Sequence, residues 1–198
     1  VYKRQVFTLP QNFTIVALTA TATAEVQQDI MSKLSIGQND VVKTSTKRRN
    51  LIFKVNPTYQ RQKFVVDYVA NHEGQAGIIY CSTRKQVEEL HEALNNEKIK
   101  STIYHAGLTN KERIEAQNDF LYDRVEVVIA TNAFGMGIDK SNVRYVIHYN
   151  MPGDLESYYQ EAGRAGRDGL KSECILLFSE RDKGCLLYTS PSPRDRTR

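Results

Sequence analysis

The sequence predicts an α/β protein in which a parallel sheet is covered by helices on both faces. From residue 77 onward, short apolar runs alternate with segments of helical length whose apolar residues recur every three or four positions. This alternation is typical of strand–helix–strand units with parallel strands. The runs "GIIYCST", "VEVVIAT" and "VRYVIHYN" are nearly continuous in apolar residues, as expected of strands that are buried on both faces.

Before residue 77 the pattern predicts two strands and two helices. "TIVALTA" at 14–20 is a β-branched apolar strand, and it leads into a helix over "TATAEVQQDIMSKL" that Thr23 can cap. "NLIFKVNP" alternates briefly and stops at Pro57. The helix over "QRQKFVVDYVANH" then places four residues on one side, namely Phe64, Val65, Tyr68 and Val69.

After residue 77 the sequence marks where each helix begins. Ser82 or Thr83 starts a helix whose apolar stripe is Val87, Leu90, His91 and Leu94. Thr109 and Glu112 form a capping box for the next helix, and Asp154 caps the helix over "LESYYQEAGRAG". The strands that separate these helices are "STIYHAG", "VEVVIAT", "VRYVIHYN" and the closing "SECILLF".

The composition is that of an ordinary globular protein, with 198 residues, 40% hydrophobic and 25% charged. No apolar run approaches the roughly 18 residues of a membrane span, and the N-terminus lacks the apolar core of a signal peptide. We therefore expect a cytoplasmic protein. Cys81, Cys174 and Cys185 include no C-x-x-C pair, so neither a disulfide framework nor a metal site is expected.

Both ends of the chain resemble a translated sequencing-library adapter. "VYKRQ" at 1–5 can be encoded by a DNA strand whose reverse complement, in another frame, encodes the "CLLYT" of 185–189. We therefore expect residues 1–5 and 185–198 to be derived from an adapter, and the tail to be disordered. Without these ends the net charge of +4 falls to zero, with 22 basic and 22 acidic residues. Net charge thus gives no support for a nucleic-acid role.

Polar residues gather in the sequence where the predicted strands end. In parallel sheets, ligands bind at the carboxyl ends of the strands, where the loops meet. We therefore expect the functional residues along this one edge of the sheet. The segments concerned are Thr19–Thr23, Ser82–Arg84, His105–Thr109, Thr131–Lys140 and residues 158–169.

Two of these segments suggest phosphate recognition. "YYQEAGRAGRDG" at 158–169 presents Arg164 and Arg167 among small residues, and the rigid donor fork of arginine suits phosphate. "ATNAFGMGIDK" at 130–140 has glycines that let the backbone approach a phosphate closely, and Asp139 supplies a carboxylate for a sugar hydroxyl or an arginine. The ordinary alternatives are a solvated helix end and a glycine-bearing turn.

Four segments together resemble a known enzyme family. In order and spacing, "ALTATAT", "IIYCSTRKQVEEL", "VVIATNAFGMGIDKSNVRYVIHYNMP" and "SYYQEAGRAGRDG" are similar to motifs III, IV, V and VI of RecQ-type superfamily 2 DNA helicases. DEAD-box RNA helicases typically have Ser-Ala-Thr in motif III and His at the start of motif VI, where this chain has "TAT" and Gln160. The resemblance covers nearly all of residues 14–180 and implies the RecA-like fold of a helicase C-terminal lobe.

The resemblance also implies a role for each candidate residue. Arg164 and Arg167 would be the catalytic arginine fingers that act on a phosphoryl group of ATP. The other nucleotide contacts would be Gln160, Gly137 and Asp139, and the coupling of nucleotide state to the bound strand would involve Thr19, Ala20 and Thr21. Single-stranded DNA would be held through its backbone by Ser82, Arg84, His105, Thr131 and Asn132. A solvated Arg84, a buried strand-end His105 and a turn-capping Thr131 stay open as alternatives.

The ATP-binding half of such an enzyme is absent from the sequence, which has neither a G-x-x-x-x-G-K-[ST] P-loop nor an Asp-Glu pair after an apolar strand. The resemblance therefore implies that residues 46–184 are the second lobe of an ATP-dependent 3′ to 5′ DNA helicase of repair and recombination. Residues 6–45 would be a remnant of the first lobe. The chain alone is expected to be inactive.

The partners implied are ATP, Mg²⁺, single-stranded or forked DNA and the first RecA-like lobe of the same parent chain, with no membrane. ATP and Mg²⁺ would be bound mainly by the first lobe, and zinc only by a downstream region. In a bacterium the protein would be associated with the nucleoid. The alternatives are a stand-alone nucleic-acid-binding lobe without enzymatic activity and an RNA helicase lobe. "TKRRN" at 46–50 is either a DNA-facing patch or, as in the family, the linker into the second lobe.

Overall fold

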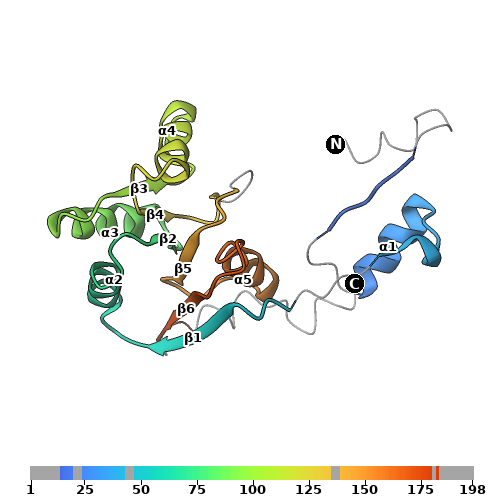
Figure 1. Ribbon diagram of the computed structural model, residues 1–198, viewed down its shortest axis with the longest axis horizontal. Helices are drawn as coiled ribbons and strands as arrows, with labels where there is room; N and C mark the ends of the chain where they lie inside the picture. Colours follow the sequence, from blue (N-terminus) through green and yellow to red (C-terminus); the bar gives the residue numbers. More distant parts are fainter. Residues whose placement is uncertain (1–13, 20–23, 43–46, 135–138, 180–181, 183–198) are drawn as a thin grey trace, which may run out of the picture. The chain divides into compact units, whose positions relative to one another are not determined.

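The computed structural model describes residues 14–19, 24–42, 47–134, 139–179 and 182. The chain divides into two compact units, Val1–Lys47 and Arg48–Arg198 (Figure 1). The two units are described separately below. In the part of the chain that the structure describes, no helix is both long and apolar enough to cross a membrane.

The first unit contains one helix and one short 3-10 turn among its described residues. Helix α1 spans Ala24–Leu34 and has no buried residue, and the turn spans Gln38–Asp40. Residues 14–19 are exposed and form no strand, so the expected strand at 14–20 is wrong over these residues. A strand needs the hydrogen bonds of a neighbouring strand, and an apolar run by itself does not supply them. The predicted cap Thr23 lies outside the described residues.

The second unit is a six-stranded sheet with helices on both faces, which confirms the predicted fold class. Its strands are β1 (Leu51–Pro57), β2 (Ala76–Tyr80), β3 (Ser101–Tyr104), β4 (Val127–Ala130), β5 (Val143–His148) and β6 (Ser172–Phe178). Their order across the sheet is β1-β6-β5-β2-β4-β3, and every neighbouring pair is parallel. The helices are α2 (Arg61–Ala70), α3 (Arg84–Asn96), α4 (Asn110–Leu121) and α5 (Leu155–Ala162).

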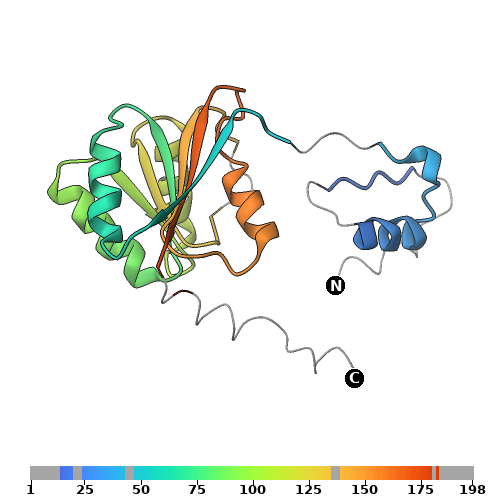
Figure 2. The same ribbon diagram turned by 90° about the horizontal axis from the view of Figure 1, so that it is seen from below.

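The sheet has a hydrophobic core on each face. On one face, Val65 of α2 and Leu90 of α3 pack with Ile79 and Ile147 from the strands. On the other face, Phe120 of α4 and Ala162 of α5 pack with strand residues such as Ile78. Figure 2 shows α2 and α5 on opposite sides of the strands. Burial on both faces explains why the central strands read as continuous apolar runs.

The helices begin where the sequence predicts. The Thr83 hydroxyl accepts a hydrogen bond from the backbone N–H of Gln86 and so caps α3. Thr109 and Glu112 form the expected capping box at the start of α4, and the Asp154 carboxylate caps α5. Each cap satisfies backbone N–H groups that have no partner within the first helical turn.

One close approach between β2 and β5 depends on a glycine. The ring of Tyr145 in β5 crosses Gly77 in β2, and a Cβ at Gly77 would lie 2.0 Å from the Tyr145 Cε2 atom. The register between the two strands shifts at the same place, between Ala76 and Gly77. Only a residue without a side chain leaves room for this buried ring.

Candidate functional site

Four neighbouring strands end in polar residues at the carboxyl edge of the sheet. Ser82 follows β2, His105 follows β3, and Thr131 and Asn132 follow β4. The Thr131 N–H donates to the Tyr104 carbonyl at 3.1 Å, and the Ser82 N–H donates to the side chain of Asn150 after β5 at 3.0 Å. Ser82 and Asn132 are exposed and Thr131 is half-buried. The structure thus brings the predicted DNA-binding residues of three strands to one edge.

His105 is only 4% exposed, so its ring presents little surface to a DNA strand. Its Nδ1 accepts the backbone N–H of Gly107 at 3.2 Å, and its Nε2 lies 3.6 Å from the Glu88 carboxylate. A Cβ at Gly107 would lie 3.0 Å from Nη1 of Arg84, so the exposed Arg84 side chain reaches over this turn. The burial favours the reading of His105 as a strand-end residue that shapes the loop beside Arg84.

The last residues of the arginine stretch lie at the opposite edge of the sheet, which corrects the expectation of a single edge. The Gly166 N–H donates to the carbonyl of Val143, the first residue of β5, at 2.8 Å. The Asp168 N–H donates to the Ser141 carbonyl at 3.2 Å. The reason is that α5 begins beyond the carboxyl end of β5 and carries the chain back, so that residues 166–168 reach the amino end of β5.

Two predicted nucleotide contacts meet at this amino edge. Arg167 Nη1 donates to Asp139 Oδ1 at 2.9 Å, and the side chains are 37% and 90% exposed, respectively. The pair joins the segments at 130–140 and 158–169, which sequence reasoning had placed in one site. Exposed ion pairs contribute little to stability, so the exchange of Asp139 for a more highly charged partner costs little in this pair.

Arg164 follows the end of α5 and is half-buried, with its charge close to the hydroxyl of Tyr80. Burial raises the pKa of Tyr80, and the positive charge of Arg164 and its hydrogen bond to the hydroxyl oppose this rise. The Tyr80 hydroxyl donates to the carbonyl of Phe134 at 3.1 Å. Next to it, Nε2 of the buried His148 lies 2.9 Å from a carboxylate oxygen of Glu161. The arginine therefore sits in a network of buried polar groups.

The turn between the two arginines is held by residues that precede β1. Arg48 Nη2 donates to the carbonyls of Ala165 and Gly166 at 3.2 and 2.6 Å. The Asn50 amide donates to the carbonyls of Gly166 and Leu170 at 2.8 and 3.0 Å. In "TKRRN", Arg48 and Asn50 thus bind the arginine stretch. The sequence contains no local signal for this contact, because the residues are more than a hundred positions apart.

The surroundings of Lys140 were also not predicted from the sequence. Its side chain is 3% exposed, its Nζ lies 2.6 Å from Asp123 Oδ1, and it lies over the ring of Phe120. A lysine in a polar loop is ordinarily solvated. Here its burial anchors the end of the segment at 130–140 against α4 and places the neighbouring Asp139 at the surface.

For five of the predicted site residues, the described contacts do not test the predicted role. Gly137, Ala20 and Thr21 lie outside the described residues, and Thr19 and Gln160 are exposed. Within the described ranges, no group of three or more His, Cys, Asp or Glu residues could hold a metal ion. The assignments of all these residues stay predictions.

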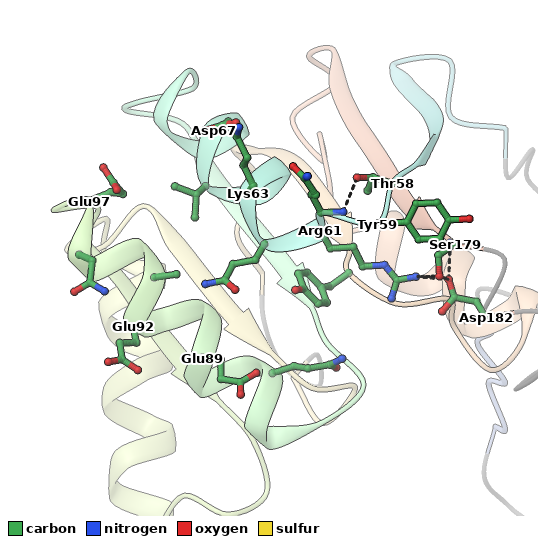
Figure 3. Close-up of a pocket in the computed structure, with 17 residues that line it drawn as sticks. Thr58, Tyr59, Arg61, Lys63, Asp67, Glu89, Glu92, Glu97, Ser179 and Asp182 are labelled. Atoms are coloured by element: carbon green, nitrogen blue, oxygen red, sulfur yellow. Dashed lines mark hydrogen bonds and ion pairs between the residues drawn. The ribbon is translucent and has the colours of Figure 1, made fainter.

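A large hollow on the α2 and α3 side of the sheet contains none of the predicted site residues. It measures about 1390 Å³ and lies between Tyr59 and Lys63 of the α2 segment and the acidic residues Glu89, Glu92 and Glu97 of the α3 segment (Figure 3). Its wall includes an ion pair between Arg61 and Asp182. The hollow is open and its lining charges are mixed in sign, so it does not indicate a ligand.

Known proteins share both the sequence and the fold. The model of the helicase conserved C-terminal domain matches residues 60–169, more than half of the chain. ATP-dependent DNA helicase RecQ of Bacillus subtilis is 51% identical over 168 residues, which are 85% of this chain and 28% of that protein. RecQ of Haemophilus influenzae is 44% identical over 168 residues, 85% of this chain and 27% of that protein.

A solved structure has the same fold at lower identity. A Saccharomyces cerevisiae Dbp5 variant bound to RNA and ADP BeF3 superposes with a TM-score of 0.77 at 23% identity, over 93% of this chain and 50% of that one. That likeness concerns the fold alone. The chain spans little more than a quarter of the length of the RecQ relatives that it matches. It belongs to the helicase conserved C-terminal domain family, and its sequence is similar to a part of the RecQ helicases.

Proposed function

We propose that this chain is the second motor lobe of an ATP-dependent 3′ to 5′ DNA helicase of repair and recombination. Arg164 and Arg167 act on the phosphates of an ATP molecule that another lobe holds together with Mg²⁺. The observation that carries this proposal is the meeting of Arg167 with Asp139, which joins two segments of RecQ-like sequence at the surface of the family's domain. Gln160 and Gly137 complete the nucleotide contacts in the proposal.

The chemistry needs a positive charge that reaches a phosphoryl group during transfer. Charge builds on the phosphate oxygens in the transition state, and an arginine that meets them there is worth about 10³ to 10⁵ in rate in related enzymes. Arg167 suits this task because one of its contacts is with an exposed carboxylate. ATP would compete with Asp139 for the guanidinium, and Asp139 would then be available to a ribose hydroxyl.

The DNA would lie at the other end of the strands. Ser82, Arg84, Thr131 and Asn132 present hydroxyl, guanidinium and amide groups, which bind a phosphate backbone without reading bases. The Arg167–Asp139 pair lies at the amino edge, whereas the charge of Arg164 lies close to the hydroxyl of Tyr80, the last residue of β2. The proposed nucleotide site thus extends along one face of the sheet towards Ser82, and β2 would transmit the closing of the nucleotide site to the DNA grip.

The test inserts residues 14–179 into Bacillus subtilis RecQ in place of the matching segment. The rest of the two-lobe enzyme then comes from Bacillus subtilis RecQ. We expect this chimera to hydrolyse ATP in the presence of single-stranded DNA and to open forked DNA. Arg167→Ala should lower the kcat of ATP hydrolysis by on the order of 10³, with a smaller effect on the KM for ATP. The chain by itself should show no turnover.

The matched control is Arg124→Ala. Arg124 also pairs with an aspartate at the surface, Asp119, at 3.0 Å, but it lies in the turn after α4. Its replacement should leave kcat within about twofold. Full activity of the Arg167→Ala chimera would refute the finger assignment. A chimera that binds DNA without any ATPase would support the stand-alone binding lobe, and unwinding of RNA duplexes alone would support the RNA helicase.

A further inference from the structure

The loop before β6 lies against the start of β5 at the amino edge of the sheet. The Gly166 N–H donates to the Val143 carbonyl at 2.8 Å, and the Asp168 N–H donates to the Ser141 carbonyl at 3.2 Å. Arg167 lies between these two bonded positions in the sequence. The backbone on both sides of the proposed finger is therefore attached to the start of β5.

The side chain of Arg144, the second residue of β5, also binds this loop. Its Nη2 donates to Asp168 Oδ2 at 2.5 Å, and its Nη1 donates to the Lys171 carbonyl at 3.4 Å. Its Nε donates to the Asn142 carbonyl at 3.1 Å, which fixes the guanidinium on its own strand. All three guanidinium nitrogens thus have partners, and together they connect β5 with the loop.

The Asp168 carboxylate extends this connection to the backbone of the turn. Its second oxygen, Oδ1, accepts the Leu170 N–H at 3.0 Å. Between them, Gly169 has a φ of +84°, and its N–H donates to the Gly166 carbonyl at 3.0 Å. Hydrogen bonds of an ionised carboxylate to a guanidinium or a backbone N–H are stronger than those between neutral groups. One carboxylate therefore binds both Arg144 and the turn.

We propose that Arg144 is a positioning residue of the nucleotide site. Through Asp168 it holds the turn at 166–170 on the start of β5, and so keeps the backbone of Arg167 in place beside Asp139. The inference rests on the proposed function, because it takes Arg167 as a phosphate-binding finger. Arg144 itself touches neither ATP nor DNA in this proposal.

The Arg144–Asp168 pair is better shielded from water than the Arg167–Asp139 pair. Its side chains are 18% and 24% exposed, compared with 37% and 90%. Partly buried pairs are screened less by water and salt than exposed ones. The Arg144–Asp168 pair therefore persists when Arg167 exchanges Asp139 for a phosphate group.

The residues before β1 hold the same turn from another side. Arg48 and Asn50 donate to the Gly166 carbonyl at 2.6 and 2.8 Å. These bonds connect the turn to the start of the second unit, whereas Arg144 connects it to the strand that follows Asp139. Loss of the Arg144 guanidinium should therefore loosen the turn beside Asp139 without unfolding the sheet.

The test uses Arg144→Met, which removes the guanidinium and keeps a long, unbranched side chain. Arg144→Lys is a second variant, which keeps the charge but lacks the donor fork that makes three bonds at once. The matched control is Lys54→Met. Lys54 also pairs with a carboxylate, that of Glu173, but on the sheet face where Tyr68 of α2 donates to the same carboxylate.

The first measurement is amide hydrogen exchange of the full chain, followed by NMR, and it needs no activity. In Arg144→Met the Asp168 and Leu170 amides should exchange about tenfold faster or more, relative to the amides of β2. Arg144→Lys should give a smaller rise and Lys54→Met none. Unchanged exchange at Asp168 and Leu170, or a rise that is equal throughout the sheet, would overturn the proposal.

The second measurement uses the two-lobe chimera. Arg144→Met should lower the kcat of ATP hydrolysis by about tenfold or more and leave the KM for ATP within about twofold, because a misplaced finger acts mainly on the transition state. Arg144→Lys should lie between Arg144→Met and the unsubstituted chimera, and Lys54→Met should keep kcat within about twofold. In an Arg167→Ala background, Arg144→Met should have no further effect.

Two kinetic results would overturn the role of Arg144 in catalysis. One is an unchanged kcat in Arg144→Met although the turn exchanges faster. The other is a further loss of kcat in the Arg167→Ala background, since Arg144 would then act through another group. An unsubstituted chimera without ATPase would instead overturn the proposed function, and the hydrogen exchange would still decide whether Arg144 holds the turn.

Discussion

Replacement of Gly166 by alanine should be among the most destabilising changes to the arginine stretch. Gly166 has a φ of +55°, and a Cβ there would lie 2.5 Å from Asn50 Nδ2 and 2.7 Å from both the Leu170 carbonyl oxygen and the Ser172 hydroxyl. A left-handed conformation costs a non-glycine residue about 1–2 kcal/mol. The Asn50 amide must also move, which weakens its bonds to the Gly166 and Leu170 carbonyls.

The two bonds of Asn50 contribute about 1 kcal/mol each, so the total loss in the free energy of unfolding should be about 3–4 kcal/mol. The measurement is urea unfolding of the full chain, followed by far-UV circular dichroism. Gly169→Ala and Gly153→Ala provide matched controls. Gly169 has a φ of +84° and Gly153 has no positive φ, and neither has an atom within 4 Å of the added Cβ.

Gly169→Ala should therefore cost only the backbone component, about 1–2 kcal/mol, and Gly153→Ala should change stability by less than about 0.5 kcal/mol. The expected order of the losses in the free energy of unfolding is Gly166→Ala, then Gly169→Ala, then Gly153→Ala. A loss for Gly166→Ala no greater than that for Gly169→Ala would refute the claim that Asn50 packs tightly against this turn.

Two further predictions concern the sheet. Gly77→Ala should cost about 3 kcal/mol in urea unfolding, because the buried Tyr145 ring must move away from the new methyl group; a loss similar to that of Gly153→Ala would contradict the close approach. The Glu173 carboxyl is partly buried, which raises its pKa, but hydrogen bonds from Lys54 and Tyr68 outweigh this effect and lower it below the ordinary 4.5. Stability from this group should be complete above about pH 5 and be lost as the pH falls through the lowered pKa, and Glu173→Gln should remove that part of the pH dependence.

Much of the second unit could be predicted from the sequence because its signals are local. The caps at Thr83, Thr109 and Asp154 depend on residues three positions away, and each is confirmed. Continuous apolar runs likewise indicated strands that are buried on both faces. The apolar run at 14–19 carried the same kind of signal but forms no strand, because strand formation depends on a neighbour that a pattern cannot supply.

The candidate site could be predicted only in part, because its contacts join residues that lie far apart in the sequence. The sequence indicated the two arginines and Asp139 as partners in one site. It did not show that α5, with eight residues and so about 12 Å long, carries Arg167 back to the amino edge. The burial of Lys140 was also unpredictable, since its partner Asp123 lies at the end of another helix.

The attachment of Arg48 and Asn50 to the arginine turn has a mechanical consequence. Four hydrogen bonds connect the point where the second unit begins with the carbonyls of Ala165, Gly166 and Leu170. A displacement of the chain at Arg48 or Asn50 should therefore strain the hydrogen bonds that hold the turn between Arg164 and Arg167. The start of the second unit is thus coupled directly to the segment that carries both guanidinium groups.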